Sequence, residues 1–239
     1  MPYYKDNFLI LDNKILKDKD LIIIVLSELF GKRDIIVKGV RGLKSRFRGA
    51  SEPFTFCKGI IHYKENSPNF LLSSVDIIET FCSINDDKQK LKVGFILLNL
   101  IKNFLQYNQV IKDFFSNTIK FFKQLKKTEN PEIIKILFTL WFIKKIGYQP
   151  NINHCSFCNK ILNDKFYLDL LTHSLVCFQC GATNNKKLFS YNLLNFLKES
   201  YLKKSINFSN VKIDVKIKNE ILNFFHYYFL ALFGRKINF

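Results

Sequence analysis

The amino-acid sequence predicts an α+β protein in which a strand-rich N-terminal domain is followed by a helical domain with an embedded cysteine module. Apolar runs rich in β-branched and aromatic residues fill residues 7–80, and turn residues separate these runs. From Asp86 onward the apolar residues recur every three or four positions, which is the period of a helix. We expect the two domains to span residues 1–80 and 81–239, with the cysteine module at residues 150–185.

The N-terminal domain is predicted to contain five strands. These strands lie at residues 8–11, 21–26, 34–40, 54–63 and 70–78. Five strands within about 75 residues suit a small closed barrel, and the OB-fold is a barrel of five strands. A fragment of a β-sandwich would show the same pattern. We therefore predict an N-terminal five-stranded OB-fold, with the sandwich as the alternative.

The helical domain is predicted to contain five amphipathic helices. Their apolar stripes lie at residues 91–105, 111–125, 134–142, 192–201 and 217–232. The third helix has the clearest boundaries, because Asn130 is a suitable N-cap, Pro131 suits the first helical position and Gly147 suits the end. Ser190 is placed to cap the fourth helix, and the last one is expected to end near Gly234. The aromatic residues in these stripes are interpreted as core.

Four of the six cysteines form two Cys-x-x-Cys pairs, Cys155 with Cys158 and Cys177 with Cys180, with 18 residues between the pairs. This spacing is typical of zinc ribbons and knuckles. Zn²⁺ prefers a tetrahedron of soft ligands, and four thiolates leave no open position for water. We therefore predict one structural Zn²⁺. Two redox-active thiol pairs would have the same spacing and are the alternative.

The other cysteines and the histidines show no ligand pattern. His154 and His173 flank the four cysteines and could replace a sulfur ligand, but a complete set of thiolates makes them bystanders. Cys57 and Cys82 lack an evident partner and are predicted to be small buried hydrophobes. Cysteines in metal-binding spacing favour a reducing compartment over a disulfide framework.

Composition restricts the location of the protein. The chain is 48% apolar and 15% aromatic, which is enough to form a sizeable core. It has no run of 18 or more apolar residues and no signal-peptide layout at its start. We therefore expect a cytoplasmic protein with no membrane segment.

A net charge of +17 favours a polyanionic partner, although lysine is abundant throughout the chain. Arginine is more informative, because four of the five arginines fall within 16 residues. The guanidinium group is planar and can contact phosphate through two hydrogen bonds. The segment 31–48, called the basic segment below, holds seven basic residues and one acidic residue. The residues predicted to contact DNA are Lys32, Arg33, Lys38, Arg41, Lys44, Arg46 and Arg48.

The second half of the basic segment is predicted to be an exposed loop. It contains closely spaced glycines and no apolar periodicity, and glycine lets a backbone approach a phosphate closely. Beside a barrel, such a loop would line a groove for single-stranded nucleic acid, with no sequence code because no recognition helix is present. Stacking faces could come from aromatic residues that also fit the core, namely Phe47, Phe54, Phe56 and Tyr63. The alternative is a solvated loop that only promotes solubility.

No catalytic arrangement is recognisable in the sequence. The chain lacks a Gly-x-x-x-x-Gly-Lys-Ser/Thr phosphate loop, a Gly-x-Ser-x-Gly turn and the His-x-Glu with Pro-Cys-x-x-Cys pattern of zinc deaminases. Carboxylates are few and scattered, and the adjacent pair Asp86 and Asp87 is typical of a helix start. We therefore expect a protein that is not an enzyme.

Several short motifs follow one another in a specific order. The N-terminal ones are Asp20 before an apolar strand, Gly31-Lys32 after it, Lys38-Gly39-Val40-Arg41, Ser45-Arg46-Phe47 and Pro53-Phe54. The C-terminal ones are Gly147-Tyr148-x-Pro150 leading into the cysteines, and Gly234-Arg235-Lys236. Together they resemble the bacterial recombination mediator family RecO over nearly the whole chain. The chain departs from the family by using Lys, Ile and Phe in place of much of its Arg and Leu.

The resemblance implies an N-terminal OB-fold, a helical domain and an embedded zinc module. Members of the family bind single- and double-stranded DNA, anneal complementary strands and help to load RecA onto DNA covered by single-stranded-DNA-binding protein, without nucleotide hydrolysis. They work with RecR and, in some lineages, with RecF, so a bacterial, nucleoid-associated protein is expected. The DNA contacts of the family carry over to Lys38 and Arg41, and to Arg46. The zinc ligands carry over to the four paired cysteines.

Two functions from other classes share these sequence features. A zinc-ribbon RNA-binding factor would bind structured RNA at least as well as DNA. A thiol-redox enzyme would use the Cys-x-x-Cys pairs for disulfide reduction and would be purified without zinc. The mediator remains the leading hypothesis.

Overall fold

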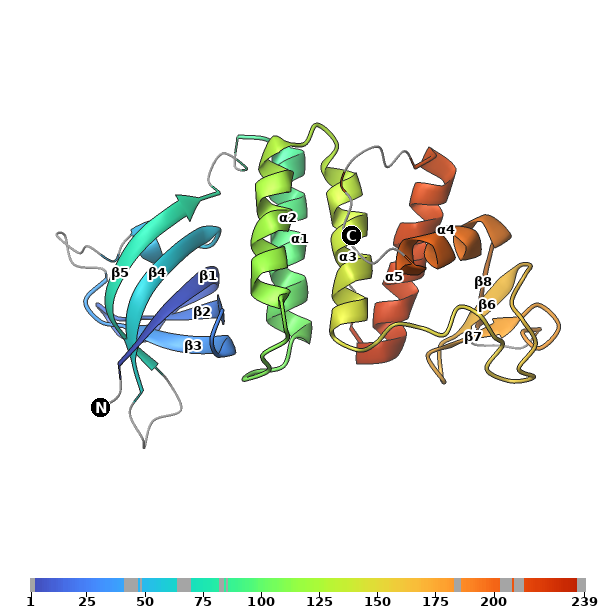
Figure 1. The fold of residues 1–239 in the computed structure, drawn as a ribbon, viewed down its shortest axis with the longest axis horizontal. Coiled ribbons are helices and arrows are strands. Elements are labelled where there is room, and N and C mark those ends of the chain that lie inside the picture. The colour runs from blue at the N-terminus through green and yellow to red at the C-terminus, as the bar shows by residue number, and fades with distance from the viewer. Residues whose placement is uncertain are drawn as a thin grey trace. The chain divides into compact units, whose positions relative to one another are not determined.

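The computed structural model describes a large part of the chain, namely residues 3–40, 47, 49–63, 70–81, 84, 86–182, 186–202, 208 and 213–235. The chain divides into two compact units, unit 1 at residues 1–134 and unit 2 at residues 135–239 (Figure 1). The domain boundary predicted between residues 80 and 81 lies within unit 1, between its strands and its first helix. In the part of the chain that the structure describes, no helix is long and apolar enough to cross a membrane.

Unit 1 contains a closed barrel of five strands, in the order β1-β2-β3-β5-β4. The strands are β1 (Tyr3–Ile15), β2 (Leu21–Ser27), β3 (Gly31–Val37), β4 (Thr55–His62) and β5 (Phe70–Thr80). Neighbouring strands pair antiparallel except β3 and β5, whose parallel pairing aligns Ile35 with Phe70 and closes the barrel. The predicted five-stranded OB-type barrel is confirmed, and the sandwich alternative is excluded.

The interior of the barrel follows the two-residue period of its strands. The fully buried residues include Phe8, Ile10, Ile23, Val25, Ile35, Val37, Cys57, Ile61, Phe70 and Leu72. Gly59 faces the same interior, where a Cβ would lie 2.9 Å from Cε1 of Phe8 and 2.7 Å from the carbonyl oxygen of Ser74. The prediction for Cys57 is confirmed, and burial raises the pKa of its thiol to about 12. Cys82 lies outside the described residues.

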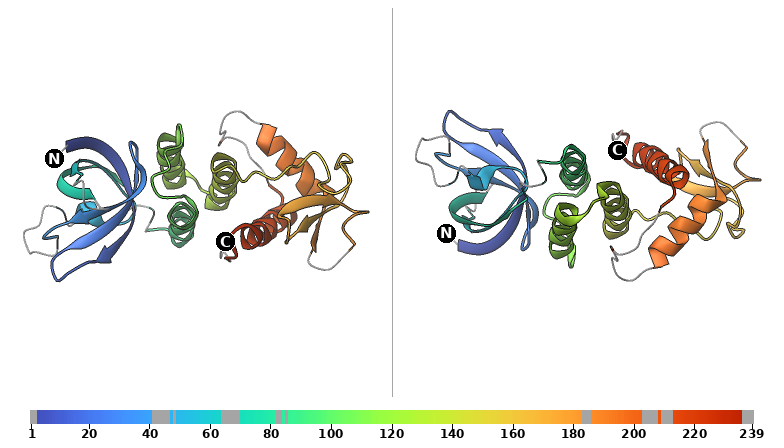
Figure 2. Two further views of the ribbon diagram at one scale, coloured as in Figure 1. Left: turned by 90° about the horizontal axis from the view of Figure 1, so that it is seen from below. Right: turned by 90° about the horizontal axis from the view of Figure 1, so that it is seen from above.

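Two helices complete unit 1, α1 (Lys88–Phe104) and α2 (Phe114–Lys127). They lie side by side next to the barrel (Figures 1 and 2). Asp87 caps α1, because its carboxylate accepts hydrogen bonds from the backbone N–H groups of Gln89 and Lys90 at 2.8 and 3.1 Å. Phe54, which has a positive φ of 67°, packs edge-on against rings of both helices. The hydrophobic core therefore continues from the barrel into the helix pair.

Helix α3 (Pro131–Lys145) begins in unit 1 and continues in unit 2, and its predicted start at Pro131 is confirmed. Gly147 follows it with a φ of +85°, which satisfies the predicted helix end. Unit 2 also contains α4 (Tyr191–Leu202) and α5 (Val215–Phe233). Ser190 caps α4 as predicted, since its hydroxyl accepts a hydrogen bond from the N–H of Leu193 at 3.2 Å. Gly234 ends α5 with a positive φ.

A three-stranded antiparallel sheet, which the sequence did not predict, forms the rest of unit 2. Its order is β7-β6-β8, with β6 (Phe166–Asp169), β7 (Ser174–Cys177) and β8 (Lys186–Phe189). The ring of Phe166 stacks on Phe189 of β8 and meets Phe224 of α5 edge-on. These contacts fix the sheet against α5 and hold the cysteine module that it carries.

Candidate metal centre and nucleic-acid interface

The four paired cysteines converge on one point of unit 2. Their Sγ atoms all lie within 4.8 Å of one another, and no other group of three or more potential ligands forms such a cluster in the described residues. Cys177 ends β7, and the other three lie in turns beside the sheet. Cys155 is buried, whereas Cys158 is exposed. The sheet thus brings together two cysteine pairs that are separated by 18 residues in the sequence.

Backbone hydrogen bonds shape the two cysteine turns. In the first turn, the N–H of Cys155 donates to the carbonyl of Lys160 at 2.8 Å, and in the second, the N–H of Cys180 donates to the carbonyl of Cys177 at 3.1 Å. The N–H of Ser156 donates to the carbonyl of Leu175 at 3.0 Å, which joins the first turn to β7. The turns are therefore positioned by the sheet itself.

A glycine packs the second turn against the sheet. A Cβ on Gly181 would lie only 1.9 Å from Cδ2 of Tyr167 in β6. A side chain here would have to displace the ring, so glycine lets the chain leaving Cys180 pass Tyr167 without such a shift. The ring of Tyr167 in turn stacks on Phe178, with centroids 5.9 Å apart.

The distances in the cluster fit a tetrahedral thiolate site, whereas the pKa shifts of its thiols differ in direction. Hydrogen bonds with Cys177 and Cys158 raise the pKa of Cys180 to about 12. A metal–sulfur bond of about 2.3 Å requires sulfurs about 3.8 Å apart in a tetrahedron. The Sγ atoms of Cys158 and Cys177 are 3.8 Å apart. Burial raises the pKa of Cys155, but backbone N–H groups including that of Phe157 outweigh it and bring the pKa down to about 6. The four cysteines can therefore hold one metal ion with a closed set of ligands.

The two flanking histidines are not part of this cluster. His154 and His173 are both exposed, and neither belongs to the group of potential ligands. His173 has a φ of +56° in the turn between β6 and β7. Their interpretation as bystanders agrees with this placement.

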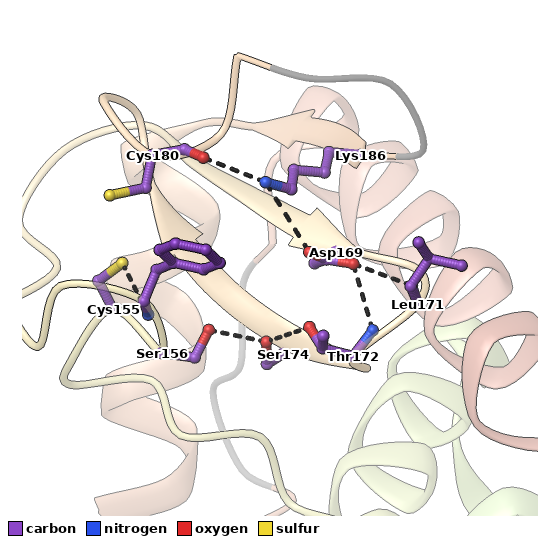
Figure 3. Close-up of polar contacts among 9 residues, drawn as sticks. Cys155, Ser156, Asp169, Leu171, Thr172, Ser174, Cys180 and Lys186 are labelled. Atoms are coloured by element: carbon purple, nitrogen blue, oxygen red, sulfur yellow. Dashed lines mark hydrogen bonds and ion pairs between the residues drawn. The ribbon is translucent and has the colours of Figure 1, made fainter.

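A polar network beside the cysteines links the central strand β6 to the edge strand β8 (Figure 3). The ammonium of Lys186 lies 3.8 Å from the carboxylate of Asp169 and donates to the carbonyl of Cys180 at 3.1 Å. Asp169 also accepts hydrogen bonds from the N–H groups of Leu171 and Thr172 at 2.9 and 3.2 Å. Asp169 and Lys186 were not predicted from the sequence, because they are 17 positions apart and belong to no motif. Their only signal is that both lie near the cysteines.

The basic segment begins with a lysine that is not on the surface. Lys32 is 4% exposed, its ammonium donates to the carbonyl of Lys102 in α1 at 2.7 Å, and it lies 4.4 Å from the ring centre of Tyr107. Burial lowers the pKa of this lysine. The predicted DNA contact of Lys32 therefore needs correction, because its charge serves the packing of the barrel on the helices and is not available to a phosphate.

The next two basic residues have different environments. The guanidinium of Arg33 lies 5.1 Å from the ring centre of Phe70 and 5.9 Å from that of Phe30, and its Nε is buried without a hydrogen-bond partner in the described part of the chain. Lys38, directly after β3, is exposed. The other predicted contacts, Arg41, Lys44, Arg46 and Arg48, lie outside the described residues.

The four aromatic residues that could have offered stacking faces to nucleic-acid bases pack against other aromatic rings or against the core of the barrel. Phe54 is buried against α1 and α2, and Phe56 lies near Phe115 of α2. Phe47 and Tyr63 are half-buried and pack against the barrel core. These positions agree with the interpretation of the four aromatic residues as core residues.

Comparison with known proteins identifies relatives along the whole chain. The family model described as recombination protein O N terminal matches residues 1–81, and the model described as recombination protein O C terminal matches residues 86–238. The chain is 28% identical to a DNA repair protein RecO of Clostridium novyi, over 92% of this chain and 86% of that protein. It is 23% identical to a DNA repair protein RecO of Caldicellulosiruptor bescii, over 95% of this chain and 99% of that protein.

Proposed function

The chain belongs to the RecO family of DNA repair proteins, and we propose that it acts as a recombination mediator. In this role it binds single- and double-stranded DNA, anneals complementary strands and helps to load RecA onto DNA coated with single-stranded-DNA-binding protein. One observation gives the main support for this proposal. The residues that match the family's N-terminal model form a closed OB-type barrel, and the basic segment belongs to the same residues.

DNA binding is assigned to the segment that follows β3. Lys38 is exposed at the start of this segment, and the remaining basic residues of the proposed interface are Arg41, Lys44, Arg46 and Arg48. Arg33 extends the interface along β3, where the two Phe rings support its guanidinium. Neutralised phosphates allow two strands to approach each other, so annealing needs charge and proximity and no covalent step. The protein is accordingly proposed to have no enzymatic activity.

The cysteine cluster is proposed to hold one structural Zn²⁺. Four thiolates are the donor set that Zn²⁺ prefers, and the sulfur–sulfur distance of 3.8 Å fits its tetrahedron. When bound, the ion cross-links the two cysteine turns and supplies no reactive chemistry. The residues around it position the turns through Gly181 and the pair formed by Asp169 and Lys186.

The expected partners follow from the same proposal. They are RecR, single-stranded-DNA-binding protein, RecA and, depending on the lineage, RecF, in the cytoplasm at the bacterial nucleoid. The family membership supports this set, and each partner requires its own binding measurement with the purified chain.

The proposal is tested by following duplex formation from two complementary DNA strands at moderate salt. The wild-type protein is expected to accelerate annealing, and Lys38→Glu/Arg41→Glu is expected to reduce both the acceleration and the salt dependence of DNA binding. Lys165→Glu/Lys216→Glu, on exposed lysines of unit 2, changes the net charge equally and serves as the control. Equal acceleration by the basic-segment variant would move the interface elsewhere, and preference for structured RNA would favour an RNA-binding factor.

A further inference from the structure

Helices α1 and α2 of unit 1 carry a surplus of lysine outside the basic segment. They have 17 and 14 residues, and together they contain eight lysines and no carboxylate. Residues 88–127 hold nine lysines and one aspartate, which is +8 of the chain's net +17. The surplus arises because acidic residues are absent from the two helices, so the lysine-rich composition of the whole chain does not by itself explain it.

These lysines are concentrated at one end of the helix pair. The helices run in opposite directions (Figure 1), so the first turns of α1 lie beside the last turns of α2. A hydrogen bond from the ammonium of Lys90 to the carbonyl of Lys126, at 3.1 Å, joins the two ends. Four exposed lysines form no ion pair within the described residues and are called the helical lysine cluster below, namely Lys88, Lys92 and Lys127 near this end and Lys120 in the middle of α2.

The carboxylates near this end do not neutralise the helical lysine cluster. Asp87 is occupied as the cap of α1, and Glu79 lies 3.6 Å from the ammonium groups of both Lys123 and Lys126. Asp86 and Glu129 are exposed, and neither forms an ion pair with the cluster in the described part of the chain. The cluster therefore keeps its positive charge.

In α1 the arrangement opposes the stability of the helix, whereas Lys127 in the last turn of α2 is favourably placed for the helix dipole. Lys88 and Lys92 are four residues apart, so like charges face each other, and both lie near the positive end of the α1 dipole. Lys120 and Lys127 are seven residues apart on one face of α2, about 10 Å along its axis. A partner with regularly spaced negative charges would remove this repulsion.

We propose that the helical lysine cluster binds the phosphates of a second DNA strand while the barrel and the basic segment hold the first. The inference rests on the proposed function, because it names the surface that annealing requires for its second strand. Phosphate contacts position a strand and leave its base edges free to pair. The barrel and the helix pair belong to the same unit, so the two strands are held by one compact body.

The test uses Lys88→Glu/Lys92→Glu/Lys120→Glu/Lys127→Glu, with Lys160→Glu/Lys165→Glu/Lys187→Glu/Lys216→Glu in unit 2 as the control. All eight lysines are exposed, and each variant lowers the net charge from +17 to +9. The DNA is oligothymidylate, which cannot pair with itself. One labelled strand is immobilised and saturated with protein, and capture of a second labelled strand is measured.

The cluster variant is expected to bind the first strand within about threefold of wild type, but to capture the second strand at least about tenfold less, with a salt slope smaller by up to about 3. The control variant is expected to capture the second strand like wild type. Thermal melting verifies that both variants fold. Unchanged capture would overturn the inference and indicate another partner, such as an acidic protein. Equal loss of the first strand would also overturn it, by making the cluster part of the first-strand site.

The same assay separates this inference from the proposed function. A wild-type protein that captures two strands without accelerating annealing of complementary ones would contradict the mediator role and leave the second-strand surface in place. A wild-type protein that anneals without capturing a second oligothymidylate would contradict the second-strand surface alone.

Discussion

The cysteine module and the basic segment are both recognisable from residue spacing, but only the side chains of the cysteine module converge in the structure. The four sulfurs converge within 4.8 Å. Lys32, Arg33 and Lys38, by contrast, are respectively buried, partly covered and exposed, although they lie within seven positions of one another. Residue spacing therefore encodes geometry only when a shared ligand requires the side chains to converge. A cluster of like charges carries no such requirement.

The physical reason lies in what each side chain can do locally. A thiolate that shares a metal must place its sulfur at one distance from one point, which excludes most backbone paths. A lysine has a long aliphatic stem that packs against apolar surface, and its ammonium can find a carbonyl inside the protein. Lys32 uses this second option at the carbonyl of Lys102. Charge counts from sequence therefore overestimate the charge that a partner meets.

The largest effect is expected at the cysteine module. Cys155→Ser/Cys158→Ser removes two of four ligands, so the metal is lost and the melting temperature of unit 2 falls, since metal binding contributes on the order of 10 kcal/mol to small zinc modules. Elemental analysis measures the metal content and thermal melting measures the stability. We expect the double variant to lose stability before it loses DNA binding. Cys57→Ala is the control, because Cys57 lies in the barrel core and should leave the metal content unchanged. An unchanged melting temperature, with no zinc in either form, would contradict the structural-metal assignment.

A smaller effect distinguishes two lysines of the basic segment. Lys32→Met leaves the carbonyl of Lys102 without its donor and is expected to lower the free energy of unfolding by about 1–3 kcal/mol. Lys38→Met is expected to change that free energy by less than about 0.5 kcal/mol, because the side chain is exposed. DNA affinity should show the reverse order, with a loss for Lys38→Met only. Urea unfolding and salt-dependent DNA titrations measure the two quantities, and equal DNA losses would show that Lys32 reaches the surface.

The smallest effect concerns a buried carboxylate in the barrel. Burial raises the pKa of Asp6 above 3.8, against hydrogen bonds from Ser27 and the N–H of Leu29. The folded state thus holds the proton more tightly than the unfolded state, so this contribution is present below pH 3.8 and is lost as the pH rises through the folded-state pKa. Relative to Asp6→Asn, the wild type should lose stability over that window. Unfolding free energies of both proteins across this pH range measure the effect, and parallel curves would contradict it.

The strands and helices of the chain could be predicted where the spacing of apolar residues in the local sequence determines them. The five barrel strands and the five helices follow from apolar period, and their predicted ends are wrong by a few residues where polar residues participate. Strand β1 starts at Tyr3, well before the predicted Phe8, because Asp6 is buried through its bond to Ser27. Helix α1 starts at Lys88, directly after the pair Asp86 and Asp87 that was interpreted as a helix start, because Asp87 caps it.

The small sheet of unit 2 could not be predicted in the same way. Its strands have four residues each, too few for a period to emerge, and they form through contacts with the cysteine turns and α5. The pair of Asp169 and Lys186 depends on the same long-range pairing, since β6 and β8 align these two residues. The cysteine ligands were predictable because their chemistry alone indicates that they meet.

The proposed annealing of DNA held by single-stranded-DNA-binding protein can be measured directly. Two complementary strands are each coated with the single-stranded-DNA-binding protein of the same organism, and duplex formation is followed at moderate salt with and without the purified chain. The wild-type protein is expected to accelerate duplex formation clearly, and Lys38→Glu/Arg41→Glu is expected to lose this acceleration. Firm DNA binding without any acceleration would contradict the mediator role and reduce the chain to a general nucleic-acid-binding protein.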